Sequence, residues 1–140
     1  MTTTEENPMD PTKLVQDSMP LCATLGVTAA ESTPDEVVLE LAWDASLCTI
    51  GGAMHGGTLM ALADSAGATC AFLNLPAGAA GTSTIETKTN FLGAATEGVV
   101  VATSRPLHVG SSTIVIETEL RVGDRLIGKT TQTQIVRRKP

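Results

Sequence analysis

Aromatic residues and positive charge are scarce in this sequence. Of its 140 residues only 2% are aromatic, with one tryptophan, two phenylalanines and no tyrosine, so the core must be built mainly from Val, Ile, Leu and Ala. Nine Lys and Arg stand against fifteen Asp and Glu, giving a formal net charge of −6. Phosphate binding draws its affinity from clustered Lys and Arg, so this balance argues against a nucleic-acid partner.

The few basic residues are unevenly placed. Seven of the nine lie from Arg105 onward, whereas residues 1–64 carry ten acidic residues and Lys13 as the only base. Two interpretations stay open at this point. The C-terminal part either binds a small polyanion or consists of a solvated strand face followed by a basic tail.

Cysteines are also few, and their spacing excludes two classes of protein. The three at positions 22, 48 and 70 are far apart and odd in number, so they fit neither a CxxC metal site nor a disulfide framework. Two scattered histidines do not complete a metal-ligand cluster. The sequence therefore predicts no metal, no cofactor and a reducing compartment.

No long apolar run is present. The N-terminal residues 1–13 are polar and acidic, where an export signal has a basic start and an apolar stretch. The most apolar segment, Thr58 to Pro76, is interrupted by Asp64, Ser65 and Gly67 and is too broken to span a membrane. These features predict a cytoplasmic protein without a membrane partner.

The apolar fraction of 42% suffices for one domain, which we expect over residues 12–140, after a loose tail at residues 1–11. The pattern predicts a short helix at Thr12–Met19, a first strand at Glu36–Trp43 and one long helix from Thr58 to Asn74. Four strands in a meander follow, at Thr82–Phe91, Gly98–Leu107, Ser112–Arg121 and Arg125–Arg138. This order predicts an α+β fold in which a mostly antiparallel sheet packs on one helix.

The segment that indicates chemistry lies at the start of the long helix. His55, Gly56 and Gly57 come where the first backbone N–H groups of a helix have no intrahelical partner and the helix dipole is positive. Glycine leaves room for a substrate carbonyl to approach those N–H groups. The segment is therefore a candidate oxyanion site.

A carboxylate follows about two turns later. Asp64 has mostly small, apolar neighbours at helical spacing, and a lone buried carboxylate is costly unless it is paired or used. Each feature alone has a plain structural explanation: the glycines as a loop, His55 as a backbone partner and Asp64 as a solvent-facing residue. Together they raise a functional site to a hypothesis on a par with the structural explanations.

The pattern HGGTLMALADSA at residues 55–66 resembles the hotdog-fold acyl-coenzyme A thioesterases of the phenylacetate-pathway type. The segment TSTIETKTNFLGAA at residues 82–95 and the paired last strands at residues 107–136 are similar to that family as well. The resemblance covers roughly residues 35–137. It implies a hotdog fold, an antiparallel sheet wrapped around one long central helix.

The resemblance also implies an activity and a role for each matching residue. The reaction is hydrolysis of a small aromatic or a short- or medium-chain acyl-coenzyme A, without a cofactor. Asp64 is the implied nucleophile or general base, Gly57 N–H the oxyanion donor, His55 the residue that shapes the turn, and Thr84 a holder of the attacking water. The implied substrate-binding residues are Thr49, Gly56, Ser111 and Arg105.

Two positions depart from the family pattern. Thr49 stands at the polar position nearest to that where relatives usually carry Asn or Gln, and a hydroxyl is a shorter donor than an amide. Ser111 stands where relatives often have a basic residue near the coenzyme A phosphates. Substrate orientation is expected to differ accordingly.

Helix geometry predicts a site shared between two chains. Gly57 and Asp64 are seven residues apart, or about 10 Å along the axis at ~1.5 Å per residue, whereas donor and nucleophile must both lie ~3 Å from one carbonyl. Two antiparallel helices across a two-fold axis solve this problem, and we expect Ala61, Gly67, Ala68 and Ala71 to permit their close approach. The geometry thus predicts a homodimer, and the resemblance implies that such dimers pair into a tetramer.

Three other functions remain open. The main alternative is a non-catalytic acyl-coenzyme A-binding or sensor protein, which would not need the acid at position 64. A hydratase or dehydratase on the same scaffold, which would place its histidine differently, is the second. A purely structural oligomer is the third, and it leaves Asp64 and the glycines without a role.

Overall fold

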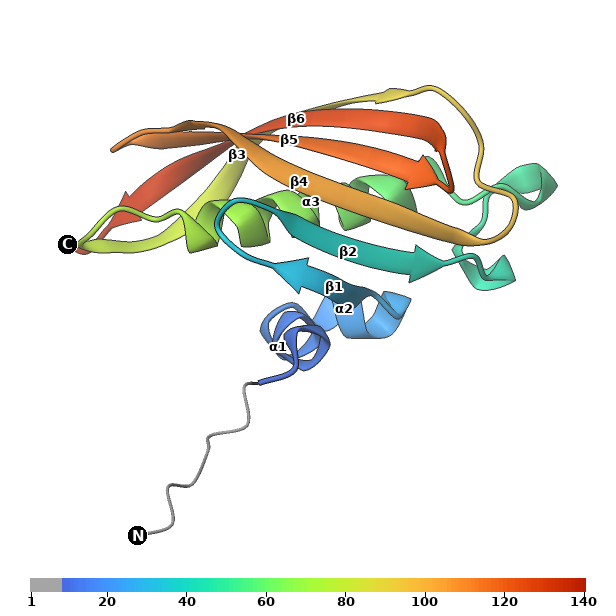
Figure 1. Cartoon of the computed structure of the whole chain (residues 1–140), viewed down its shortest axis with the longest axis horizontal. Helices are drawn as coiled ribbons and strands as arrows, with labels where there is room; N and C mark the ends of the chain where they lie inside the picture. Colours follow the sequence, from blue (N-terminus) through green and yellow to red (C-terminus); the bar gives the residue numbers. More distant parts are fainter. Residues whose placement is uncertain (1–8) are drawn as a thin grey trace, which may run out of the picture.

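A computed structural model describes residues 9–140, in which one long helix, α3 (Gly56–Leu73), lies against a six-stranded antiparallel sheet. The strands are β1 (Thr28–Ser32), β2 (Val37–Ala42), β3 (Ala79–Phe91), β4 (Val99–Val109), β5 (Thr113–Val122) and β6 (Arg125–Arg138). Figure 1 shows the sheet curving over α3, with the N-terminal helices beside β1. This arrangement confirms the predicted α+β hotdog fold. No helix within residues 9–140 is long and apolar enough to cross a membrane.

Two short helices precede the sheet. Helix α1 (Pro11–Ser18) begins after Asp10, whose carboxylate accepts a hydrogen bond of 3.0 Å from the Thr12 N–H, and it matches the predicted helix within one residue. Pro20 ends α1 as expected but also begins α2 (Pro20–Leu25), because a first helical position does not use its N–H. Helix α2 was not predicted. Residues 1–8 of the predicted tail lie outside the described part of the chain.

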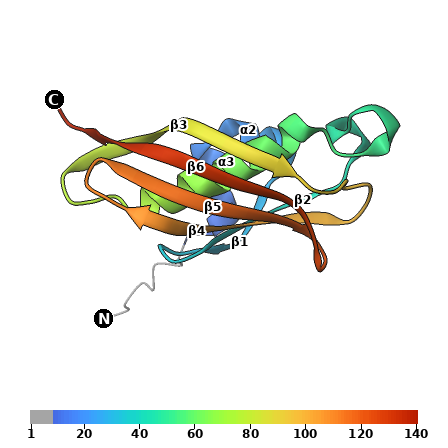
Figure 2. The same ribbon diagram turned by 90° about the horizontal axis from the view of Figure 1, so that it is seen from above.

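The strand order corrects the predicted meander. Strands β4, β5 and β6 follow one another, but the order β1-β2-β4-β5-β6-β3 places β3 beside β6 at one edge, as Figure 2 shows from above. Pairing runs from Ala79 opposite Arg138 to Phe91 opposite Gly128. A meander requires strands that are consecutive in sequence to be neighbours in the sheet. In the structure β5 and β6 lie between β3 and β4, so the connection from β3 to β4 crosses the sheet.

A strand before the predicted first strand was also missed. Strand β1 has the sequence TAAES, in which only Thr28 is β-branched, and none of its residues is fully buried. It pairs with β2, so the predicted strand at Glu36–Trp43 is the second of the sheet. The composition of this segment therefore indicates a strand only weakly. Its hydrogen bonds to β2 stabilise the extended conformation.

Helix α3 packs its small residues on the sheet. Its buried face consists of Leu59, Leu62, Ala63, Ala66, Gly67, Cys70 and Ala71. A fully buried Leu such as Leu62 contributes about 1.5–3 kcal/mol, and the buried alanines that follow it bring the helix close to β4 and β5. Gly67 and Ala71 were expected at a helix–helix contact between chains. That expectation is wrong for these two, because both face the sheet of their own chain.

The long helix begins and ends near its predicted limits. It starts two residues earlier than expected, with His55 as N-cap, and ends at Leu73 with Asn74 as C-cap. The Asn74 side chain donates hydrogen bonds to the Cys70 carbonyl (2.8 Å) and to the Pro34 carbonyl (2.7 Å). These bonds tie the C-terminal end of α3 to the turn between β1 and β2.

Burial predicts which cysteine reacts. Burial raises the pKa of the Cys70 thiol to about 11, and the negative charge of Asp35 adds to this shift. Cys22 is also buried, whereas Cys48 is partly exposed. Because the thiolate is the reacting species, iodoacetamide at pH 8 should modify Cys48 and leave Cys70 intact until denaturant is added. Peptide mass spectrometry measures this, and modification of Cys70 in the folded protein at a rate equal to that of Cys48 would contradict the packing described.

Candidate functional site

The N-terminus of α3 is capped by the imidazole of His55. Its Nδ1 accepts a hydrogen bond of 2.8 Å from the Gly57 N–H, in the manner of a side-chain N-cap. A Cβ at position 57 would lie only 2.9 Å from that nitrogen, so the capping geometry requires glycine there. The ring of Phe91 lies over Gly56, where a Cβ would approach its Cζ to 3.3 Å.

The His55 cap determines which N–H groups of the first helical turn remain free to bind a substrate oxygen. The Gly57 N–H, predicted as the oxyanion donor, already donates to His55 and is not free as that prediction requires. Within residues 9–140, no hydrogen bond is formed by the N–H of Gly56 or Thr58, while that of Leu59 donates to the His55 carbonyl. The open donors of the first turn are therefore Gly56 and Thr58.

Asp64 lies half-buried on α3, and both of its hydrogen bonds come from the sheet. Its Oδ1 accepts one of 2.8 Å from the Thr84 hydroxyl on β3 and one of 3.1 Å from the Gln132 amide on β6. Hydrogen bonds to a charged group contribute about 1.5–3 kcal/mol each. Thr84, predicted in the site, thus contacts Asp64 directly.

The hydrogen bonds continue along β6 beyond Thr84. The Gln134 amide donates to the Thr84 hydroxyl (2.5 Å), and the Thr82 hydroxyl donates to Gln134 Oε1 (2.5 Å). Neither glutamine was predicted in the site. The available signal was the alternation of polar residues Thr130, Gln132 and Gln134 at period two, on the same strand face as the buried Val136.

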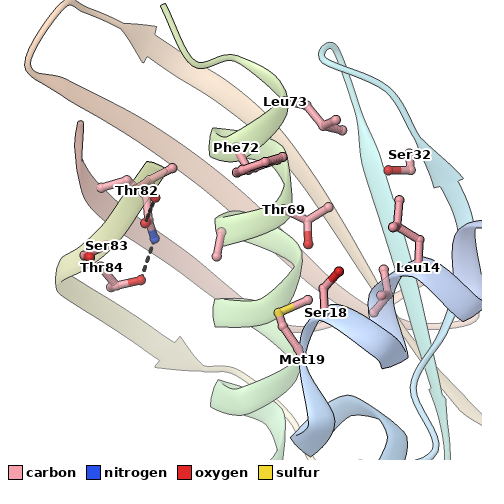
Figure 3. A pocket seen from close by; sticks show the side chains of 13 residues that line it. Leu14, Ser18, Met19, Ser32, Thr69, Phe72, Leu73, Thr82, Ser83 and Thr84 are labelled. Atoms are coloured by element: carbon pink, nitrogen blue, oxygen red, sulfur yellow. Dashed lines mark hydrogen bonds between the residues drawn. The ribbon is translucent and has the colours of Figure 1, made fainter. Parts of the chain in front are cut away.

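A cavity of about 470 Å³ opens beside this network. Figure 3 shows Thr82 and Thr84 on one side of α3, and Leu14 and Ser18 of α1, followed by Met19, on the other, with Phe72 and Thr69 between them. Its complete lining is Leu14, Val15, Ser18, Met19, Ser32, Ala68, Thr69, Phe72, Leu73, Thr82, Ser83, Thr84 and Gln134. Thr84 belongs to this lining and also donates to Asp64, so one hydrogen bond connects the carboxylate to the cavity wall, although Asp64 itself does not line the cavity.

Three predicted substrate-binding residues lie apart from Asp64. Thr49 is exposed in the loop before α3, Arg105 forms an ion pair of 2.5 Å with Glu36, and the Ser111 carbonyl accepts a hydrogen bond from Arg138. None of the three is hydrogen-bonded to Asp64 within the described chain. No group of three or more potential metal ligands comes together in residues 9–140.

Residues 51–129, more than half of the chain, match the family profile of the Thioesterase superfamily. No curated protein matches the sequence. Among solved structures, a thioesterase family protein from Silicibacter pomeroyi is 27% identical with a TM-score of 0.81, covering 92% of this chain and 97% of its own. A conserved protein from Pseudomonas aeruginosa is 28% identical (TM-score 0.76, covering 83% and 92%). A mutant thioesterase from the same organism, 20% identical (TM-score 0.83, covering 93% and 96%), shares the fold.

Proposed function

The chain belongs to the thioesterase superfamily, and we propose that it hydrolyses an acyl-coenzyme A to the free acid and coenzyme A. The observation that carries the proposal is the Asp64 carboxylate, which accepts hydrogen bonds from Gln132 and from Thr84, a residue that also lines a largely apolar cavity. We further propose the phenylacetate-pathway type of enzyme, acting on a small aromatic or a short- or medium-chain acyl group.

Asp64 performs the chemical step in this proposal. The ionised carboxylate either attacks the thioester carbonyl carbon, expelling the coenzyme A thiolate and leaving a mixed anhydride that water hydrolyses, or it takes a proton from the water that attacks. Thr84 keeps Oδ1 in place in both routes. Both routes develop negative charge on the carbonyl oxygen.

The first turn of α3 supplies the donors for that oxygen. Since the Gly57 N–H is held by His55, the proposed donor is the Gly56 N–H, and Gly57 contributes only when the imidazole turns away. The helix dipole adds partial positive charge at the same place. His55 thereby fixes the shape of the turn.

The donor and the carboxylate meet between two chains in the proposed enzyme. Gly56 and Asp64 are eight residues apart on one helix, about 12 Å at ~1.5 Å per residue, so one chain does not place both against one carbonyl. Strand β3 offers the contact, because it pairs only with β6 and leaves its other edge without a partner among residues 9–140. An exposed edge of this length is a template for a second strand.

The exposed side chains on this side of the molecule support a second copy as the partner. Ile85 on β3 is 58% exposed and Phe91 48%, while Met60 of α3 is 37% exposed. An antiparallel pairing of two β3 strands about a two-fold axis near residues 87–88 would bring Phe91 of one chain opposite Thr84 of the other. Because Phe91 covers Gly56 and Thr84 binds Asp64, the two half-sites would then meet. Two such dimers would form the proposed tetramer.

The cavity receives the acyl group in this proposal. Its walls combine aliphatic side chains of α1 and the thioether of Met19 with Phe72 of α3, and such a surface accepts aromatic and unbranched acyl groups alike. The proposed roles of Thr49, Arg105 and Ser111 are contacts to the coenzyme A portion. We place the reaction in the cytoplasm, because the three cysteines are unpaired, and we propose that it needs no metal or cofactor.

Replacing Asp64 tests the enzymatic proposal. With a panel of aliphatic and aromatic acyl-coenzyme A esters, Asp64→Asn should lower kcat by at least about a hundredfold, since the amide is neither a base nor a nucleophile. Release of free thiol measures the rate. Asn retains the acceptor oxygen for Thr84, so folding should be preserved.

Asp17→Asn is the matched control, because Asp17 is an exposed acid paired with Lys13 on α1. Its rates should equal those of the unaltered protein. Tight binding of an ester without turnover by the unaltered protein would contradict catalysis and favour the sensor alternative.

Mixing two inactive variants tests the shared site. Gly56→Pro removes one N–H at the helix position that best tolerates proline, and His55 (φ −59°, ψ 136°) already has the conformation that precedes proline. Gly56→Ala keeps the N–H and makes the same Cβ contact with Phe91, so it serves as control. Gly56→Pro should be inactive, whereas Gly56→Ala should keep measurable activity, lowered only by the Cβ that narrows the approach of the carbonyl to the N–H.

Unfolding and refolding Asp64→Asn together with Gly56→Pro should restore about a quarter of the normal rate, because half of the dimers are hybrids with one intact site. A site contained in one chain predicts no recovery. Activity of Gly56→Pro alone would exclude its N–H as the donor.

A further inference from the structure

Gln132 stands out because its burial is complete and its hydrogen bonding is not. The side chain is 0% exposed, and its Nε2 donates to Asp64 Oδ1. Its Oε1 is buried and has no hydrogen-bond partner within residues 9–140. A buried oxygen without a partner destabilises a fold, so its presence requires an explanation.

Gly67 on the neighbouring helix lowers the stability of the fold as well. Gly67 lies in the interior of α3, where glycine is less favourable than alanine by about 1 kcal/mol. A Cβ at this position would lie 1.9 Å from Gln132 Oε1. The helix therefore omits a side chain at the point where the carboxamide rests.

Gln132 Oε1 is left without a partner because the hydrogen bond from Nε2 to Asp64 fixes the orientation of the amide. Turning the amide over would place Oε1 against a carboxylate oxygen and lose the hydrogen bond. The other polar side chains of this region are satisfied: Thr130 bonds Thr89, and Gln134 bonds both Thr82 and Thr84. Within residues 9–140, Gln132 Oε1 is the only buried side-chain nitrogen or oxygen atom without a hydrogen-bond partner.

We infer that Gln132 is a positioning residue for Asp64, retained for catalysis at the expense of stability; the inference rests on the proposed function. Thr84 and Gln132 both donate to Oδ1, and Oδ2 has no hydrogen bond within the described residues. The two donors come from β3 and β6 and fix the plane of the carboxylate. Oδ2 is thereby the oxygen that attacks the thioester or takes the proton of water.

Gln132→Met separates this role from a structural one. Methionine has a similar length and no donor, so the buried unpaired oxygen disappears together with the bond to Asp64. We expect kcat to fall about 10- to 100-fold, the equivalent of one hydrogen bond to a charged group, with KM within about twofold. The melting temperature should change little, because the lost bond to Asp64 is offset by the removal of a buried unpaired oxygen.

Thr118→Val is the control for loss of a buried polar group. Thr118 on β5 is 0% exposed and bonds Ser104 at 2.6 Å, with no contact to Asp64 among its hydrogen bonds. Its melting temperature should fall while kcat stays the same. Gly67→Ala provides a second test, because its Cβ displaces the carboxamide while the glutamine is kept, and kcat should fall as in Gln132→Met.

The inference is overturned if Gln132→Met and Gly67→Ala both keep kcat within about twofold of the unaltered enzyme. It is also overturned if Gln132→Met melts at a lower temperature with a raised KM, as for a purely structural residue. Failure of the proposed function itself looks different, since the unaltered protein would then hydrolyse no ester.

Discussion

The attachment of the Asp64 carboxylate to the sheet is the contact around which the site is organised. A charged group on a helix that otherwise packs on apolar residues needs donors, and Thr84 and Gln132 provide them from two strands. That requirement explains the neighbouring features: Gly67 leaves room for Gln132, Gln134 orients Thr84, and β6 carries polar residues toward the core. The helix, the edge strand and its neighbour are thus coupled through one carboxylate.

The elements of the fold were predictable where the chain carries a local signal. The limits of α3 follow from composition and from the glycines and proline that bound it, and the alternation of β5 and β6 is equally clear. The pairing of strands was harder to predict, because the place of β3 beside β6 depends on contacts between residues about 50 positions apart in the sequence. Strand β1 could not be predicted because TAAES has almost no intrinsic strand preference, and α2 could not because a proline after a helix indicates its end as readily as the start of another.

The site was predictable only as far as its residues are close in sequence. His55, the two glycines and Asp64 share one helix, so spacing alone places them together. Gln132 enters from a strand 68 residues away, and its contact depends on the register of β6 against α3. The use of the Gly57 N–H by His55 is likewise a matter of side-chain rotamer, which no sequence pattern encodes. The sequence thus suggested the candidate residues, while the tertiary structure shows which side chains form hydrogen bonds with Asp64.

The most direct test of this account is the structure of the protein bound to a coenzyme A analogue in which a methylene group replaces the thioester sulfur. The account predicts that the ketone carbon lies ~3 Å from Asp64 Oδ2 of one subunit and its oxygen ~3 Å from the Gly56 N–H of the partner, with the acyl group in the cavity beside Thr84. An analogue bound within one subunit, with its ketone away from Asp64, would contradict the account.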